Sequence, residues 1–176
     1  MKRIFLCLLS IFIIACQQNT STNILYSSEF DGIQYFGEDS FLLEGTDIPD
    51  SLKENKYDRL PISYKDLVRE PVWNLSKNSS GLSIRFLSNS SVITAKWELL
   101  NNFSMDHMPD TGIKGIDLYF KNNNKWQYVN TGRPAGFNNE YRLIDNMDNE
   151  LREYKIFLPL YDGIKNIEIG IDSSSF

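Results

Sequence analysis

Residues 82–99 read LSIRFLSNSSVITAKWEL, and the hydrophobic pattern of this stretch decides the fold class. Apolar and polar side chains alternate through residues 82–86 and again through residues 93–99. A period of two places every second side chain on the same face of a β-strand. The serine- and asparagine-rich run 88–91 between the two segments has the composition of a turn. The stretch therefore predicts a β-hairpin with one buried face.

The same period recurs on both sides of this stretch. A second hairpin is predicted for residues 116–128, with its turn at 122–124. Further strands are predicted near 33–36, at 154–158 and at 167–171. Short strands separated by asparagine- and glycine-rich turns are typical of an all-β fold built from two packed sheets. We therefore expect a β-sandwich that is jelly-roll-like in its connections.

Helix signals are few, and they predict one short helix at residues 63–69. Ser63 and Asp66 have the spacing of a capping box, with aspartate in place of the usual glutamate. Pro71 is expected to stop this helix, because proline has no backbone N–H with which to continue it.

The first residues have the layout of an export signal. Lys2 and Arg3 precede an apolar run, residues 4–15, that is too short to span a bilayer as a helix. The run ends at residues 13–16 (IIAC), which fits a lipobox: branched apolar residues, a small residue, then the cysteine that is acylated. We therefore expect Cys16 to be lipidated. The alternative is an ordinary secretory signal with a chance cysteine.

This interpretation divides the chain into three parts. Residues 1–15 are the expected signal peptide, 16–27 the lipidated cysteine with a flexible tether, and 28–176 one β-sandwich domain. The mature protein is expected in the bacterial cell envelope, periplasmic or at the surface, and attached to a membrane only through its lipid anchor.

Cysteine count and charge exclude several classes of function. Of the 2 cysteines, Cys7 lies in the expected signal and Cys16 would carry the lipid, so no disulfide or cysteine nucleophile is expected. Loss of residues 1–15 removes Lys2 and Arg3 and no acid, which changes the formal net charge from -5 to -7. An acidic chain without a basic stripe is not expected to bind nucleic acid.

The sequence offers no catalytic constellation. A Ser-His-Asp hydrolase needs a serine that a histidine activates, and the chain has 1 histidine, His107. Ser40 follows Glu38 and Asp39 and resembles a Gly-Asp-Ser nucleophile block only superficially. The acidic residues between 145 and 150 lack EF-hand spacing. We therefore predict no catalytic residue, no cofactor and no metal site.

Four segments carry a resemblance to a known family. They are residues 69–75 (REPVWNL), 81–86 (GLSIRF), 105–108 (MDHM) and 115–119 (GIDLY). Together with later segments at 131–134, 152–154, 158–163 and 167–170, they resemble the Gly-x-Asp-Leu-Tyr domain found upstream of the catalytic domain in SGNH-hydrolase-type esterases. The resemblance covers about residues 57–172.

The resemblance implies a β-sandwich fused in front of a secreted carboxylic-ester hydrolase, often one that acts on acylated glycans. No Gly-Asp-Ser block occurs in this sequence, so the hydrolase domain itself is not expected here. The expected function is that of a non-catalytic accessory domain of an SGNH-hydrolase-type (GDSL-like) esterase, with the hydrolase domain as its partner. The alternative, from another class, is a carbohydrate-binding surface lipoprotein.

Residues 103–115 are the candidate partner interface or ligand loop. Met105, His107 and Met108 are expected between two strands, where methionine offers an adaptable apolar contact. Asp117 occupies an outward position of the next predicted strand, where it could orient the histidine or cap the loop. The alternative is a packed loop in which the methionines fill gaps.

Trp126 is the candidate for stacking on a glycan, because sugars stack on exposed aromatic faces. It follows a predicted turn, whereas Trp97 lies on the apolar side of its strand and is expected in the core. Exposure of Trp73, Trp97 or Trp126 would favour the carbohydrate-binding alternative.

Overall fold

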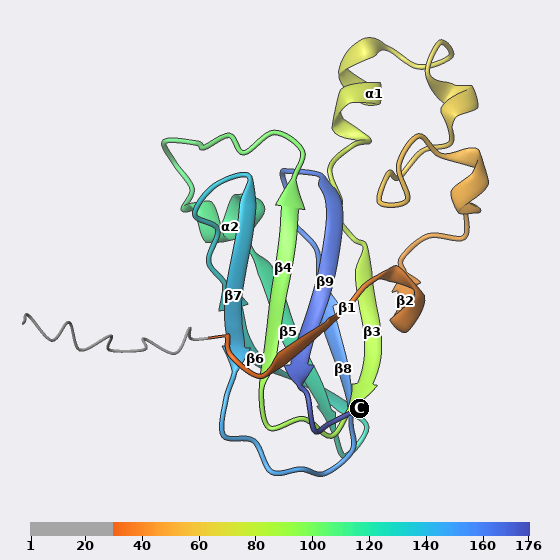
Figure 1. The fold of residues 1–176 in the computed structure, drawn as a ribbon. Helices are drawn as coiled ribbons and strands as arrows, with labels where there is room; N and C mark the ends of the chain where they lie inside the picture. Colours follow the sequence, from red (N-terminus) through yellow and green to blue (C-terminus); the bar gives the residue numbers. More distant parts are fainter. Residues whose placement is uncertain (1–29) are drawn as a thin grey trace, which may run out of the picture. The chain divides into compact units, whose positions relative to one another are not determined.

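Two antiparallel β-sheets form the body of the domain (Figure 1). The computed structural model describes residues 30–176, and residues 32–176 make one compact unit. The four-stranded sheet has the order β1-β9-β4-β7, and the five-stranded sheet has the order β2-β3-β8-β5-β6. The strands are β1 (Ile33–Phe36), β2 (Leu42–Glu44), β3 (Ser83–Ser88), β4 (Ile93–Leu99), β5 (Ile116–Asn122), β6 (Lys125–Gly132), β7 (Asn138–Ile144), β8 (Arg152–Phe157) and β9 (Ile164–Asp172).

The core lies between the two sheets, because each sheet turns its apolar face toward the other. In β4 the alternate residues from Ile93 to Leu99 are buried, while Lys96 and Glu98 between them are only partly buried. Ile84 in the opposite sheet is fully buried in the same cluster. Burying one such side chain contributes about 1.5–3 kcal/mol, so this cluster supplies most of the driving force for folding. The predicted β-sandwich is confirmed.

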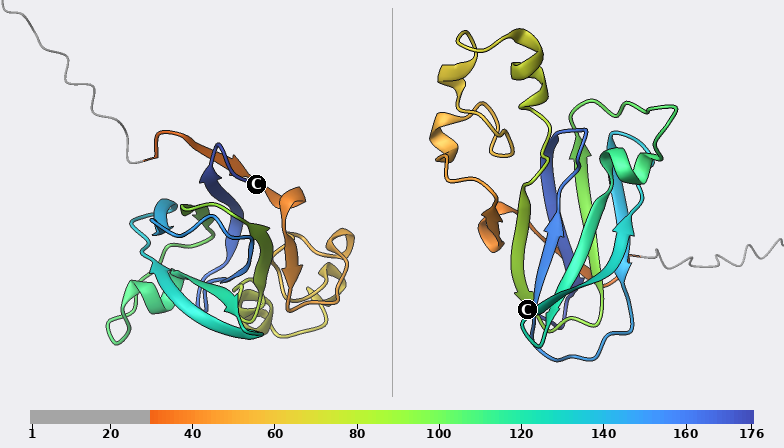
Figure 2. Two further views of the ribbon diagram at one scale, coloured as in Figure 1. Left: turned by 90° about the horizontal axis from the view of Figure 1, so that it is seen from below. Right: turned by 180° about the vertical axis from the view of Figure 1, so that it is seen from behind.

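The predicted hairpin at residues 82–99 is wrong in its pairing, although both of its strands exist. β3 pairs with β2 and β8, whereas β4 pairs with β7 and β9 in the other sheet. The apolar faces of β3 and β4 therefore meet across the core instead of lying side by side. Most successive strands change sheet in this way, as the colours in Figure 2 show, and such crossings accord with the expected jelly-roll-like connections.

The second predicted hairpin is confirmed. β5 and β6 pair from Asn122↔Lys125 to Ile116↔Gly132. The two residues between them, Asn123 and Asn124, have φ values of 48° and 60°. Positive φ at both central positions is the requirement of a type I′ turn, and asparagine adopts this conformation more readily than other residues with a Cβ.

The predicted helix at residues 63–69 is misplaced. A short 3-10 helix covers Ile62–Tyr64, and the α-helix that follows, α1, spans Glu70–Leu75 with Pro71 in its first turn. Proline at the start of a helix loses no intrahelical hydrogen bond, and its fixed φ suits the helix. Pro71 therefore begins a helix here and does not end one.

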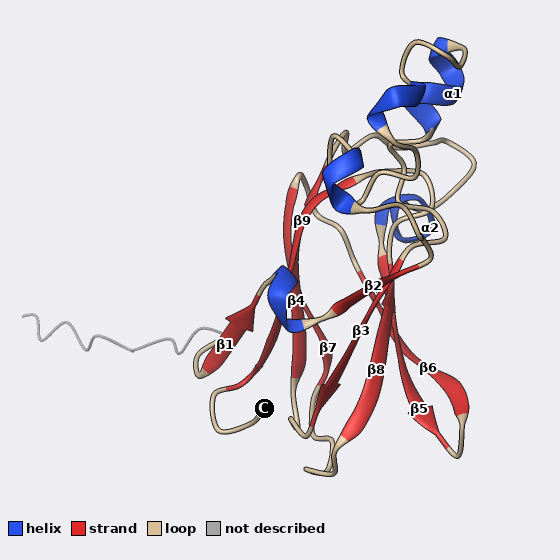
Figure 3. Ribbon diagram, turned by 90° about the vertical axis from the view of Figure 1, so that its right-hand side faces the viewer, coloured by secondary structure: helices blue, strands red, loops and turns tan. Residues whose placement is uncertain are grey.

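The elements that were not predicted are β2, β7, a second short α-helix, α2 (Asp110–Lys114), and the 3-10 helices at Glu38–Ser40 and Asp50–Leu52. β7 lies at the edge of its sheet, and of its side chains Asn139 and Leu143 are buried. An edge strand of this kind has little apolar alternation to detect. Figure 3 shows α1 and α2 toward the same end of the sandwich.

The expected signal peptide, the lipidated Cys16 and the tether lie outside the described residues. They therefore stay predictions. Within residues 30–176, no helix has both the length and the apolar character needed to cross a membrane.

Candidate functional site

The segment between β4 and β5, which contains the candidate loop, begins at a buried carboxylate. Asp162, in the β8–β9 connection, has none of its surface exposed. Its Oδ2 accepts the backbone N–H of Asn102 at 2.7 Å, and its Oδ1 accepts those of Asn101 at 3.0 Å and Gly163 at 2.7 Å. A carboxylate can be buried at tolerable cost when backbone donors surround it in this way. Asp162 thus ties the two connections together.

A buried lysine fixes the other end of the same segment. Lys114, the last residue of α2, donates to Asn102 Oδ1 at 2.8 Å and lies 3.2 Å from Asp110 Oδ2. Ser104 donates to Asp110 Oδ1 at 2.7 Å. That hydrogen bond, followed by the one from Lys114, lowers the pKa of the Asp110 carboxyl. The base of the loop is therefore held by hydrogen bonds at both ends.

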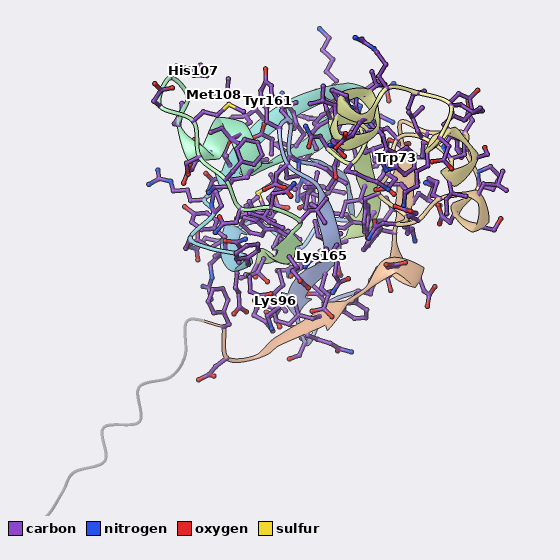
Figure 4. The ribbon with its side chains drawn as sticks, turned by 90° about the horizontal axis from the view of Figure 1, so that it is seen from above. Trp73, Lys96, His107, Met108, Tyr161 and Lys165 are labelled. Atoms are coloured by element: carbon purple, nitrogen blue, oxygen red, sulfur yellow. The ribbon has the colours of Figure 1, made fainter. Side chains whose placement is uncertain are left out.

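The tip of the loop, residues 105–108, projects from this base. Met105 and Met108 form an isolated antiparallel bridge, and Asp106 and His107 make the turn between them. The side chain of His107 is 71% exposed, and its Nδ1 lies 3.2 Å from Asp106 Oδ1. Both methionines are partly exposed. Seen from above in Figure 4, His107 and Met108 lie on the same side of the molecule as Tyr161, an exposed residue whose N–H donates to the carbonyl of Ile113.

Asp117 is oriented as predicted but has a different partner. It faces away from the core on β5, between the buried Ile116 and Leu118. Its Oδ1 accepts a hydrogen bond from Thr131 Oγ1 at 2.5 Å, and that hydroxyl lies 2.9 Å from the hydroxyl of Tyr128. The carboxylate beside His107 is that of Asp106. Asp117 therefore belongs to a hydrogen-bonded group with Thr131 and Tyr128 on the outer face of the five-stranded sheet.

That outer face carries aromatic residues that the sequence reasoning did not single out. The ring of Tyr119 packs edge-to-face against Phe157 at 5.4 Å and against Tyr128 at 5.6 Å between centroids. Phe157 is 40% and Tyr128 55% exposed. For Tyr119 and Phe157 the signal was available, because each stands next to a core residue at an outward position of a predicted strand.

Of the three tryptophans, only Trp126 is more than marginally exposed. Trp97 is 2% exposed, which confirms its predicted place in the core, and Trp73 is 7% exposed. Trp126 is half-buried on β6, and the ammonium groups of Lys155 and Lys121 lie 4.8 and 5.6 Å from its ring centroid. These cation–π contacts occupy part of the surface that a sugar would need.

A shallow polar groove of about 340 Å³ lies on the opposite, four-stranded sheet. Residues of β4, β7 and β9 line it, namely Lys96, Trp97, Glu98, Asn138, Asn139, Glu140, Asn166 and Glu168. Within residues 30–176, no group of three or more His, Cys, Asp or Glu side chains could hold a metal ion.

Residues 33–176 match the family described as "GxDLY: N-terminus of Esterase_SGNH_hydro-type". None of the curated proteins is similar enough to this chain to count as a match.

Two solved structures share the fold. A Bacteroides ovatus protein described as a GDSL-like lipase is 35% identical, with a TM-score of 0.76 over 82% of this chain and 42% of its own. The salicylyl-acyltransferase SsfX3 from a tetracycline biosynthetic pathway is 11% identical, with a TM-score of 0.54 over 83% of this chain and 41% of its own, and shows the fold alone.

This chain thus spans less than half the length of these two proteins. The family match covers almost all of the described residues and includes the Gly-x-Asp-Leu-Tyr segment at 115–119. The chain belongs to the GxDLY family, the N-terminal domain of SGNH-hydrolase-type esterases.

Proposed function

We propose that this domain is a non-catalytic accessory domain that supports an SGNH-type hydrolase domain through a protein interface. The family match carries this proposal, because in relatives the domain stands N-terminal to the esterase domain. The likeness to a GDSL-like lipase at 35% identity supports the same partner.

The loop tip at residues 105–108 is proposed as part of that interface. Its base is fastened by Asp162 and Lys114, while its tip presents two methionines and an exposed histidine. A rigid base spares the tip the entropic cost of ordering on contact. Methionine side chains adapt to a partner surface, and the imidazole can donate or accept one hydrogen bond at its edge.

A chimeric enzyme tests this function. Residues 30–176 replace the matching part of the Bacteroides ovatus protein, and hydrolysis of p-nitrophenyl acetate is measured together with thermal unfolding. We expect this chain alone to show no hydrolysis above a heat-killed control, and the chimera to unfold in one cooperative transition. Activity of this chain that a Ser40→Ala variant loses, or two independent transitions in the chimera, would contradict the proposal.

We also propose that the protein is exported as a lipoprotein through Cys16. The lipobox at residues 13–16 supports this step. Metabolic labelling with a tagged fatty acid is expected to mark the wild type, and a Cys16→Ser variant should stay unlabelled. A labelled Cys16→Ser variant would rule out this residue as the lipidation site.

Carbohydrate binding is the second candidate function, and the polar groove on the four-stranded sheet favours it. Asn138, Asn166 and Glu168 present amide and carboxylate groups in this groove, and such groups hydrogen-bond to sugar hydroxyls. Titration calorimetry with acetylated oligosaccharides tests this candidate. Binding that Asn138→Ala weakens would place glycans in the groove, binding that Trp126→Ala weakens would place them on the five-stranded sheet, and absence of binding would remove the candidate.

A further inference from the structure

In the segment between β2 and β3, several charged and polar residues are buried, whereas several aliphatic side chains are exposed. We call residues 45–81 the β2–β3 lobe. Gly45 and Gly81 close its base with φ values of 91° and 85°, and a Cβ on Gly45 would lie 2.2 Å from the carbonyl oxygen of Gly81. Figure 1 shows the lobe, in orange to yellow, projecting from the same end of the sandwich as the β4–β5 loop.

Charged and polar groups hold the interior of the lobe. Asp58, 3% exposed, accepts from Lys77 Nζ at 2.6 Å and from the backbone N–H of Asn55 at 3.0 Å. Glu54 pairs with the same Lys77 at 2.7 Å and with Lys65 at 2.8 Å. Further buried polar residues of the lobe are Lys53, Ser76, Asn78 and Ser79.

Two aromatic residues are the main apolar anchors of the lobe. Tyr57 is 1% and Trp73 7% exposed, and Lys77 Nζ lies 4.2 Å from the Trp73 ring centroid. The side chain of Trp73 thus faces inward from α1, and Figure 4 places it well apart from His107. The ionic network and these two rings account for the lobe's internal order.

The aliphatic side chains of the lobe point outward instead. Leu67 is 77% exposed, and Leu75 is 57% exposed on α1, three positions after the exposed Val72. Residues three apart in a helix share a face, so Val72 and Leu75 form one apolar stripe beside the buried Trp73. The apolar patch of the lobe comprises Leu52, Ile62, Tyr64, Leu67, Val72 and Leu75.

Six exposed apolar side chains thus come from residues 52–75 of one lobe. Exposed apolar surface larger than that of a typical monomer marks a protein or membrane interaction site. The charged neighbours of these six side chains are balanced, with Lys65 and Arg69 beside Asp66 and Glu70. A membrane-surface element is typically rich in lysine and arginine and is attracted to anionic lipids. A balanced rim around an apolar centre is typical of a protein interface.

We infer that this apolar patch is the surface on which the SGNH hydrolase domain docks. The inference rests on the proposed function and extends it from the loop tip to the lobe. The occupant follows from the comparison, because more than half of the Bacteroides ovatus chain lies beyond the part that this chain matches. The ion pairs of Glu54 and Asp58 are made within the lobe, so a partner does not have to supply their counter-charges.

Carbene footprinting of this chain alone and of the chimera with the Bacteroides ovatus hydrolase part tests the inference. We expect strong labelling of residues 62–75 in the chain alone and a severalfold drop in the chimera. Leu151, in the β7–β8 connection at the other end of the sandwich, is 56% exposed and serves as the matched control, whose labelling should not change. Equal labelling of residues 62–75 in both proteins would overturn the inference.

Variants separate this inference from the proposed function. Leu75→Ser should leave the unfolding of the chain alone almost unchanged and split the single transition of the chimera, whereas Leu151→Ser should do neither. A chimera that unfolds cooperatively while Leu75→Ser has no effect would refute the lobe interface and keep the accessory function. If residues 62–75 of the chain alone lose their labelling because the chain dimerises, the patch binds a second copy and the inference is overturned. If they lose it when phosphatidylglycerol vesicles are added, the patch binds a lipid surface and the inference is likewise overturned.

Discussion

Asp162 and Asn102 are joined by a hydrogen bond of 2.7 Å from the backbone N–H of Asn102 to the buried carboxylate of Asp162. Asn102 has a φ of 52°, and its side-chain oxygen accepts in turn from Lys114. One residue in the left-handed conformation is thus held by a buried anion on its backbone and a buried cation on its side chain. This relationship fixes where the candidate loop leaves the sandwich.

Asp162→Asn should destabilise the domain by about 1–3 kcal/mol, because an amide oxygen is a weaker acceptor and its NH₂ group faces backbone donors. Equilibrium urea unfolding measures this loss. Asp106→Asn, at a fully exposed position of the same loop, is the control and should change stability by less than about 0.5 kcal/mol. Equal effects of the two variants would refute the anchoring role of Asp162.

Met105→Ala and Met108→Ala should each cost less than about 1 kcal/mol, because both side chains are partly exposed at the loop tip. Ile113→Ala, at a fully buried position of α2, should cost about 2–5 kcal/mol. Thermal melts of the three variants check this. A large loss in both methionine variants would mean that the tip is packed as core and would leave its interface role without support.

The turn of the β5–β6 hairpin should tolerate glycine better than any branched residue. Asn124 has a φ of 60°, so Asn124→Gly should be neutral or slightly stabilising, while Asn124→Val should cost about 1–2 kcal/mol. Unfolding free energies from chemical denaturation give the comparison. A stable Asn124→Val variant would show that the turn changes its conformation freely.

Acid should weaken the β2–β3 lobe through Glu54. Hydrogen bonds from Lys65 and then Lys77 lower the pKa of Glu54 from its ordinary 4.5 to about 2. Because folding lowers this pKa, the contribution of Glu54 to stability is present above pH 4.5 and is lost as the pH falls toward 2. Hydrogen exchange of the lobe amides between pH 6 and pH 3 measures the effect.

Glu54→Gln should flatten that pH dependence, whereas Glu70→Gln, at an exposed position of the same lobe, should leave it in place. The size of the change is expected to be modest, since Glu54 is solvent-accessible and its ion pairs are screened. A wild-type pH profile that matches that of Glu54→Gln would rule out the ion pairs as stabilisers of the lobe.

Strand alternation by itself determined which residues enter the core. Trp97 and Ile84 are buried as their positions predict, because a period of two assigns side chains to faces whatever strand lies beside them. Asparagine likewise revealed the β5–β6 turn, since few other residues with a Cβ adopt positive φ as readily. The family resemblance also rested on local segments, and the match over residues 33–176 confirms it.

Apart from the β5–β6 hairpin, only the tertiary structure decided how the elements meet. The alternation in residues 82–99 could not say that β3 and β4 lie in different sheets, because pairing depends on distant strands. Pro71 begins a helix and does not end one, since the surrounding lobe selects among conformations that local propensity leaves open. The donors Asn101 and Asn102 that surround the Asp162 carboxylate stand 61 and 60 positions before it in the chain. Burial and hydrogen bonding are properties of these long-range contacts, and no local pattern encodes them.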